Sequence, residues 1–271
     1  MRFTSLLLYF LVFSQSLIVY AQSVRGHVID KNSGEPIPYV NIGIVEKNFG
    51  TISNDAGQYK LTFSKHQLKD YILFQHVSYE PKAILVEDLI KGTDVYLEER
   101  VSALNEVIIF SKATKRKKIG IRTHNPLLWG GLGIGEEDIY EIAQEIKTNR
   151  TLRLVDFNIF LRIYQDSLPF KFRIKLYKSA DGVPGDMIIN DNIIIDGVVS
   201  GWNTVDLSPY NIVIKGDFFV SIEFLPSPNA EMHNIYAGSV LIGGNRYARN
   251  SSLGKWNKAQ GGYKLYVTGE Y

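Results

Sequence analysis

The chain has 271 residues, with 30 Lys and Arg, 28 Asp and Glu and no cysteine, and its formal net charge is +2 at pH 7. Without cysteine it forms no disulfide, lacks the lipid-bearing residue of a bacterial lipoprotein and has no thiol for redox chemistry. This length is enough for one large or two medium domains, each with its own core.

Residues 1–21 have the layout of a secretory signal peptide. Arg2 precedes an apolar run, and small residues follow at Ala21 and Ser23. A membrane anchor is the alternative, but polar residues at 14–16 interrupt the run, and a span needs roughly 20 apolar residues. We therefore expect cleavage after Ala21 and an exported mature chain without a transmembrane span, located in the periplasm or at the outer membrane or cell surface.

Residues 22–110 are expected to form an all-β domain. Turn residues separate seven short apolar or alternating segments, "VRGHVID", "PYVNIGIVE", "GTIS", "GQYKLTF", "YILFQHVSY", "TDVYLEE" and "NEVIIF". In "SNDAGQY", Asp55 is expected to accept a backbone N–H and Gly57 to adopt the left-handed conformation, which closes a hairpin. A calcium site needs more oxygen ligands than this segment offers, so we interpret it as a structural turn.

The order of these segments resembles the carboxypeptidase regulatory-like domain, a prealbumin-type seven-stranded β-sandwich. The resemblance implies that Gly26, Gly34, Pro38, residues 54–57 and Tyr59 shape turns and strand ends and are not catalytic. The same domain resembles the N-terminal extension of TonB-dependent receptors of Bacteroidota, where a segment like "ALNEVIIFSK" leads into the plug. The remaining chain is too short for the rest of such a receptor. We expect "NEVIIF" to be the last strand of the sandwich, with a contact to TonB as an alternative.

Charge separates the next region from its neighbours. Residues 22–110 hold 9 Lys and Arg against 12 Asp and Glu, residues 111–135 hold 6 against 0, and residues 136–271 hold 14 against 16. The basic cluster 115–118 has no interleaved aromatic residues, and an exported protein meets little nucleic acid. We interpret 111–135 as a flexible, glycine-rich linker, with attraction to anionic lipid or lipopolysaccharide as a minor role.

Residues 136–271 show a second all-β pattern, with turn signals at the spacing of a sandwich. The stretch 136–147 has helical propensity, but "KTNR" is typical of a hairpin turn, so a strand is expected in its second half. The segments from "RIKLYK" to "SIEFL" resemble the jelly-roll modules of exported bacterial proteins. The resemblance implies a second β-sandwich.

The candidate binding site lies at 243–263, where aromatic, cationic and amide side chains occur among glycines. Sugars stack their C–H faces on Trp or Tyr and pair their hydroxyls with Arg or Asn. The candidate ligand-binding residues are Arg246, Tyr247, Asn250, Trp256 and Tyr263. The alternative is that Trp256 and Tyr263 pack the core of the sandwich.

The sequence contains no G-x-S-x-G motif, phosphate-binding loop or metal triad, and no His-x-x-Glu pair of a zinc carboxypeptidase. We therefore expect no catalytic residues, no cofactor, no metal and no nucleic-acid partner. The predicted function is an exported, non-catalytic binding or assembly module of the cell envelope, whose partner is an envelope protein or a polysaccharide. The alternatives are a glycan-binding component of a nutrient-uptake system and a glycoside hydrolase that uses carboxylates such as Asp156, Asp206 or Glu223.

Overall fold

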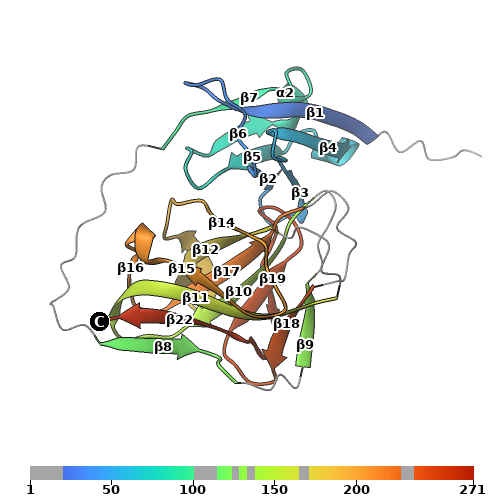
Figure 1. The fold of residues 1–271 in the computed structure, drawn as a ribbon. Helices are drawn as coiled ribbons and strands as arrows, with labels where there is room; N and C mark the ends of the chain where they lie inside the picture. Colours follow the sequence, from blue (N-terminus) through green and yellow to red (C-terminus); the bar gives the residue numbers. More distant parts are fainter. Residues whose placement is uncertain (1–20, 101–114, 124–127, 133–137, 165–170, 227–234) are drawn as a thin grey trace, which may run out of the picture.

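The computed structural model describes residues 21–100, 115–123, 128–132, 138–164, 171–226 and 235–271. In these ranges the chain is mostly β-strand, and its sheets form two sandwiches (Figure 1). The prediction of an all-β fold with two sandwiches is confirmed. The predicted signal peptide up to residue 20 and the expected strand "NEVIIF" lie outside the described residues.

The first sandwich has seven strands among the described residues. One sheet has the order β4 (Gln58–Ser64), β1 (Ala21–Asp30), β7 (Val95–Leu97), and the other the order β3 (Phe49–Ile52), β2 (Asn41–Ile44), β5 (Tyr71–Gln75), β6 (Lys82–Leu85). A 3-10 turn (Lys65–Gln67) follows β4, and a short helix α2 (Val86–Leu89) follows β6. In β4, buried Tyr59, Leu61 and Phe63 alternate with exposed residues, because only one face of this sheet meets the core.

The turn after β3 leads from one sheet of this sandwich to the other, so the hairpin expected there is wrong. The backbone N–H groups of Ala56 and Gln58 donate to Asn54 Oδ1 at 3.0 and 2.9 Å. Asn54, and not Asp55, is therefore the side-chain acceptor of the turn. Gly57 has the expected left-handed backbone, with φ of 69°, and a Cβ at this position would lie 2.8 Å from a backbone oxygen of β1.

The second sandwich has an inner and an outer sheet. The inner sheet has the order β13 (Val183–Met187), β12 (Lys171–Ala180), β17 (Phe218–Phe224), β10 (Tyr140–Ile146), β19 (Arg246–Arg249), β20 (Asn257–Ala259), and β14 (Ile193–Asp196) also pairs with β12. The outer sheet has the order β21 (Gly262–Tyr263), β18 (Ile235–Val240), β11 (Thr151–Ile163), β22 (Leu265–Glu270), β8 (Arg116–Gly120). In addition, β15 (Gly201–Asp206) and β16 (Val213–Lys215), with a 3-10 turn (Ser208–Tyr210) between them, pair with β11, and β9 (Leu128–Leu132) pairs with β18. The strand expected in the second half of 136–147 is present as β10.

The interpretation of 111–135 as a flexible linker is wrong for the two strands that the structure describes in this stretch, β8 and β9. β8 pairs antiparallel with β22, and β9 pairs antiparallel with β18. Both strands belong to the outer sheet, and β8 is its edge. Arg and Lys on an exposed edge oppose pairing with a further chain, which gives a structural reason for the basic cluster 115–118.

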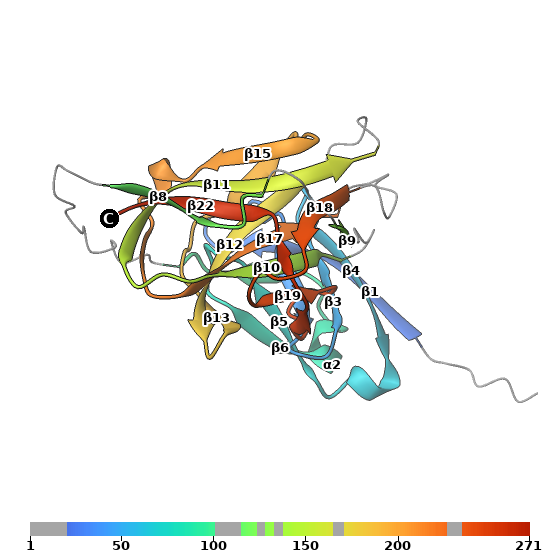
Figure 2. The ribbon, with the colours of Figure 1, turned by 90° about the horizontal axis from the view of Figure 1, so that it is seen from below.

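The four sheets are stacked in layers, and the outer sheet is farthest from the first sandwich (Figures 1 and 2). The inner sheet is covered on both faces, by the core of its own sandwich and by the first sandwich. All seven residues of β17 are therefore buried. The first sandwich approaches Ser252 of the second sandwich closely at Gly43 and Gly50. A Cβ at these positions would lie only 2.4 and 2.8 Å from the Ser252 backbone oxygen, so the close approach requires glycine.

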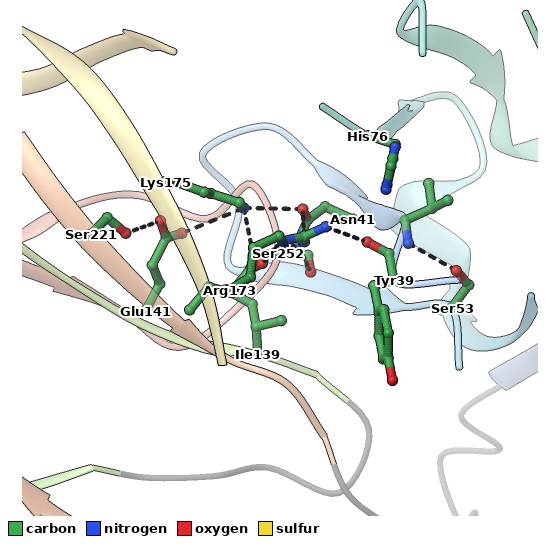
Figure 3. A network of polar contacts seen from close by, with 12 residues as sticks. Tyr39, Asn41, Ser53, His76, Ile139, Glu141, Arg173, Lys175, Ser221 and Ser252 are labelled. Atoms are coloured by element: carbon green, nitrogen blue, oxygen red, sulfur yellow. Dashed lines mark hydrogen bonds and ion pairs between the residues drawn. The ribbon is translucent and has the colours of Figure 1, made fainter. Parts of the chain in front are cut away.

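A buried polar network joins the two sandwiches (Figure 3). Asn41 of β2 donates to Glu223 at 2.7 Å and accepts from Arg173 at 2.8 Å and from Lys175 at 3.1 Å. Glu223 also accepts from Arg173 Nε and from Lys175 Nζ, each at 2.6 Å. Beside them, Arg249 Nε donates to Glu141 at 2.7 Å. These side chains are 9% exposed or less, so the contact between the sandwiches contains ion pairs that water does not screen.

The charges of this network are unequal, with three cationic side chains and two carboxylates. Burial lowers the pKa of Lys175 from its usual value. Burial would by itself raise the pKa of Glu223, but Arg173 and Lys175 outweigh it and lower that pKa to about 2. His76 lies over the network (Figure 3), and burial, followed by Arg173 and Lys175, lowers its pKa to about 3. His76 is therefore neutral at pH 7 and adds no further positive charge.

Candidate binding site

The outward surface of the outer sheet carries a row of aromatic side chains. The rings of Trp129 and Phe160 are 5.7 Å apart between centroids, those of Phe160 and Trp202 are 5.3 Å apart, and those of Trp202 and Tyr266 are 5.2 Å apart. All four side chains are half-buried. We call these four residues, with the side chains around them, the aromatic face.

Strand alternation accounts for the position of these rings. In β11, Phe157, Ile159 and Leu161 point into the core, so Phe160 and Arg162 point outward. The register pairs Phe160 of β11 with Trp202 of β15, and Trp129 of β9 with Gly238 of β18. Rings from four strands thus meet on one surface of the sheet.

Three cations lie against these rings. The Arg162 guanidinium is 4.1 Å from the Trp129 centroid, Lys264 Nζ is 3.8 Å from that of Phe160, and Lys118 Nζ is 5.2 Å from that of Tyr266. Each distance is within the range of a cation–π interaction. The aromatic face therefore combines apolar planes with positive charge.

Polar side chains continue this surface beyond the rings. Thr204 donates to Asn158 at 2.7 Å, and the Asn158 amide donates in turn to Asp156. At the far end of β22, hydrogen bonds from Arg153 and Arg116 hold the pKa of Glu270 below its usual value. Glu270 is thus an ionised and already paired carboxylate.

This arrangement has the chemical features of a binding surface. Flat, half-buried rings offer a surface on which the C–H face of a sugar can stack, and neighbouring amide, hydroxyl and guanidinium groups can pair with its hydroxyls. Within the described part of the chain, no three His, Asp or Glu side chains lie close enough together to hold a metal ion.

The five residues predicted as a binding site do not form a single exposed cluster. Tyr263 is 4% exposed, in the core of the second sandwich, and the Arg246 guanidinium lies 4.6 Å from its ring centroid. Tyr247 is 6% exposed and packs on Phe219, on the opposite face of the inner sheet. Asn250 is exposed at the end of β19. Three of the five thus have structural contacts inside the molecule.

Trp256, the remaining predicted residue, lies at a cleft between the two sandwiches. Its ring is 5.8 Å from that of Tyr177 and 4.3 Å from the Arg249 guanidinium. The cleft has a volume of about 310 Å³ and is also lined by Asn41 and Lys175. Trp256 therefore packs beside the buried network and not on the aromatic face.

Sequence reasoning missed the aromatic face because its members are far apart along the chain. Trp129 lies in the stretch interpreted as a linker, and a lone tryptophan such as Trp202 in "SGWNTVDL" is expected in the core from the sequence alone. A signal was present in "DFNIFLRIY", where Asp156, Asn158, Phe160 and Arg162 occupy one parity of an alternating strand. An aromatic residue on the polar side of such a strand indicates an exposed ring.

Comparison with known proteins places the first sandwich in a family. Residues 24–109 match the model of the CarboxypepD_reg-like domain, which confirms the predicted carboxypeptidase regulatory-like domain. No curated protein matches the chain.

Two solved structures show a distant likeness to the chain. A clostridial cysteine protease, Cwp84 after propeptide cleavage, is 12% identical, with a TM-score of 0.41 over 90% of this chain and 61% of that one. The cysteine protease and lectin-like domains of Cwp84, a surface layer associated protein of Clostridium difficile, are 11% identical, with a TM-score of 0.40 over 90% and 54%. The chain thus spans less than two thirds of either protein. In the described residues, no helix has the length and apolar character needed to cross a membrane.

Proposed function

We propose that this protein is an exported, non-catalytic module of the cell envelope that binds a saccharide through the aromatic face. The observation that carries the proposal is the row formed by Trp129, Phe160, Trp202 and Tyr266, half-buried on the sheet surface farthest from the first sandwich. Rings in such a position contribute little to either core, and they match the apolar faces of sugars. Export is supported by the signal-like layout of residues 1–21.

In this proposal the regulatory-like domain acts as a support. Its buried contacts with the inner sheet fix the orientation of the second sandwich and lie on the side of that sheet away from the outer sheet. Rigid elements hold a binding surface more accurately than loops do. A role as an assembly module that contacts another envelope protein is the second candidate, and the same aromatic face is its supporting observation.

The chain's three tryptophans provide a matched experiment. The double variant Trp129→Ala with Trp202→Ala should lower affinity on a polysaccharide array at least tenfold, about 1.4 kcal/mol, with the fold retained in circular dichroism. Trp256→Ala should keep the affinity, because that ring lies at the cleft between the sandwiches.

Loss of binding in Trp256→Ala alone would return the site to residues 246–263. If the wild-type protein bound no saccharide, the proposal would fail and the assembly role would remain.

A further inference from the structure

Lys264 lies beneath the aromatic face in an unusual state. The side chain is 0% exposed, and among the described residues its ammonium has no hydrogen-bond or ion-pair partner. Its Nζ is 3.8 Å from the Phe160 centroid and 5.4 Å from that of Trp202. An ammonium normally has three hydrogen-bond acceptors, so the rings replace them only in part.

The fold makes room for this lysine. Gly238 lies beside it on β18, and a Cβ there would be 2.9 Å from Lys264 Cδ and 3.1 Å from Phe160 Cδ1. Because Gly238 has no side chain, the aliphatic part of the Lys264 side chain can pack against the sheet there, and its ammonium reaches the rings. An apolar side chain would fill the same space without the cost of burying a charge.

The carboxylates of the aromatic face do not neutralise this charge. Asp156 is bonded to Asn158, and Glu270 is held by Arg153 and Arg116. Asp206, opposite Asp156 in the register, is held by the backbone N–H of Ser208. Besides Lys264, the cations that contact the four rings are Arg162 and Lys118, and both are exposed. The rings therefore lie among three cations, of which Arg162 and Lys118 are exposed and so are screened by salt.

We propose that the aromatic face selects acidic saccharides, with the sugar ring stacked on the tryptophans and its carboxylate held by the field of Lys264, Arg162 and Lys118. This inference rests on the proposed function and specifies its substrate class. The unpaired ammonium supplies an opposite charge to a ligand carboxylate without first breaking an internal ion pair. A neutral saccharide would gain the stacking but not the charge interaction.

The test compares acidic polysaccharides with matched neutral forms. Polygalacturonate, alginate and hyaluronan would each be titrated calorimetrically beside the same polymer after chemical reduction of its carboxyl groups to hydroxymethyl groups. At least one acidic form should bind tenfold or more tightly than its reduced form. Lys264→Met should abolish most of the ratio between the two affinities, and Lys65→Met, which removes an exposed lysine of the first sandwich, should leave that ratio unchanged.

The outcomes separate this inference from the proposed function. Equal affinity for acidic and reduced forms, or an unchanged preference in Lys264→Met, would overturn the selectivity and leave saccharide binding intact. No binding to any form would overturn both. If Lys264→Met did not fold, the preference of the wild-type protein for the acidic form would be measured at about 0.05 M and about 0.5 M salt. An electrostatic preference should shrink severalfold, and a constant one would refute the inference.

Discussion

Removing the charge of Glu223 should destabilise the whole molecule. Glu223 is fully buried and accepts hydrogen bonds from Asn41, Arg173 and Lys175 at 2.6 to 2.7 Å. Glu223→Gln preserves the shape but leaves two buried cations without their main counter-ion, since Glu141 is 4.0 Å from Lys175. Breaking a buried pair in this way costs about 3–5 kcal/mol. For a chain of this size, that corresponds to a fall in melting temperature of about 10 °C.

The assay is urea unfolding followed by tryptophan fluorescence, with thermal melting as a second measurement. Glu98→Gln is the matched control, because Glu98 forms a 2.6 Å pair with Lys31 in which both side chains are more than half exposed. No measurable change is expected in the control, since exposed pairs contribute little. Equal effects of the two variants would refute the argument that burial of the network determines its contribution.

A double-mutant cycle tests whether the network joins the two sandwiches in solution. Asn41 belongs to the first sandwich, and Glu223 to the second. Asn41→Ala leaves N–H groups of Arg173 and Lys175 unsatisfied and should cost about 1–3 kcal/mol. The double variant should deviate from additivity by about 1 kcal/mol or more. Strict additivity, or two separate unfolding transitions in the wild type, would mean that the sandwiches are independent.

The remaining predictions concern pH, the turn and the edge strand. Glu223 has a folded-state pKa of about 2 against an ordinary value of 4.5, so its stabilisation, about 3 kcal/mol, should be present above pH 4.5 and lost toward pH 2. Urea midpoints from pH 6 to 3 would check this, and Glu223→Gln should show a flatter profile. Gly57→Val should cost about 1–3 kcal/mol in urea unfolding, because the left-handed backbone excludes a branched side chain. Asp55→Ala should cost less, because its exposed carboxylate loses only solvent-accessible contacts, with the Tyr39 hydroxyl and Lys171. Trypsin should cleave after Lys117 or Lys118 only on global unfolding, because β8 is paired with β22; rapid cleavage there, detected by mass spectrometry, would contradict that pairing.

The sequence by itself determined the features that depend on local pattern. Alternation in "GQYKLTF" predicts a strand with Tyr59, Leu61 and Phe63 on one face, and the structure has that face buried in the first core. Asp55 and Gly57 predict a bend, and the bend is present with Gly57 in the left-handed conformation, although Asn54 and not Asp55 accepts its backbone N–H groups. The motif order in residues 24–109 also identified the regulatory-like domain. Each of these signals is contained in a few neighbouring residues.

Only the tertiary structure decided which surfaces meet. In β17, Ser221 and Glu223 alternate with apolar residues, which predicts one polar side of the strand. The sequence cannot say that this polar side is covered by Asn41 from the first sandwich. The pairing of β9 with β18 brings Trp129 to Phe160, and the pairing of β15 with β11 brings Trp202 to the same ring. Strand partners and register are set by the packing of distant segments, and a shift of one residue would turn these rings into the core. The five residues predicted at 246–263 were grouped by proximity in the chain, whereas alternation along β19 directs Arg246 and Tyr247 to opposite faces of the inner sheet.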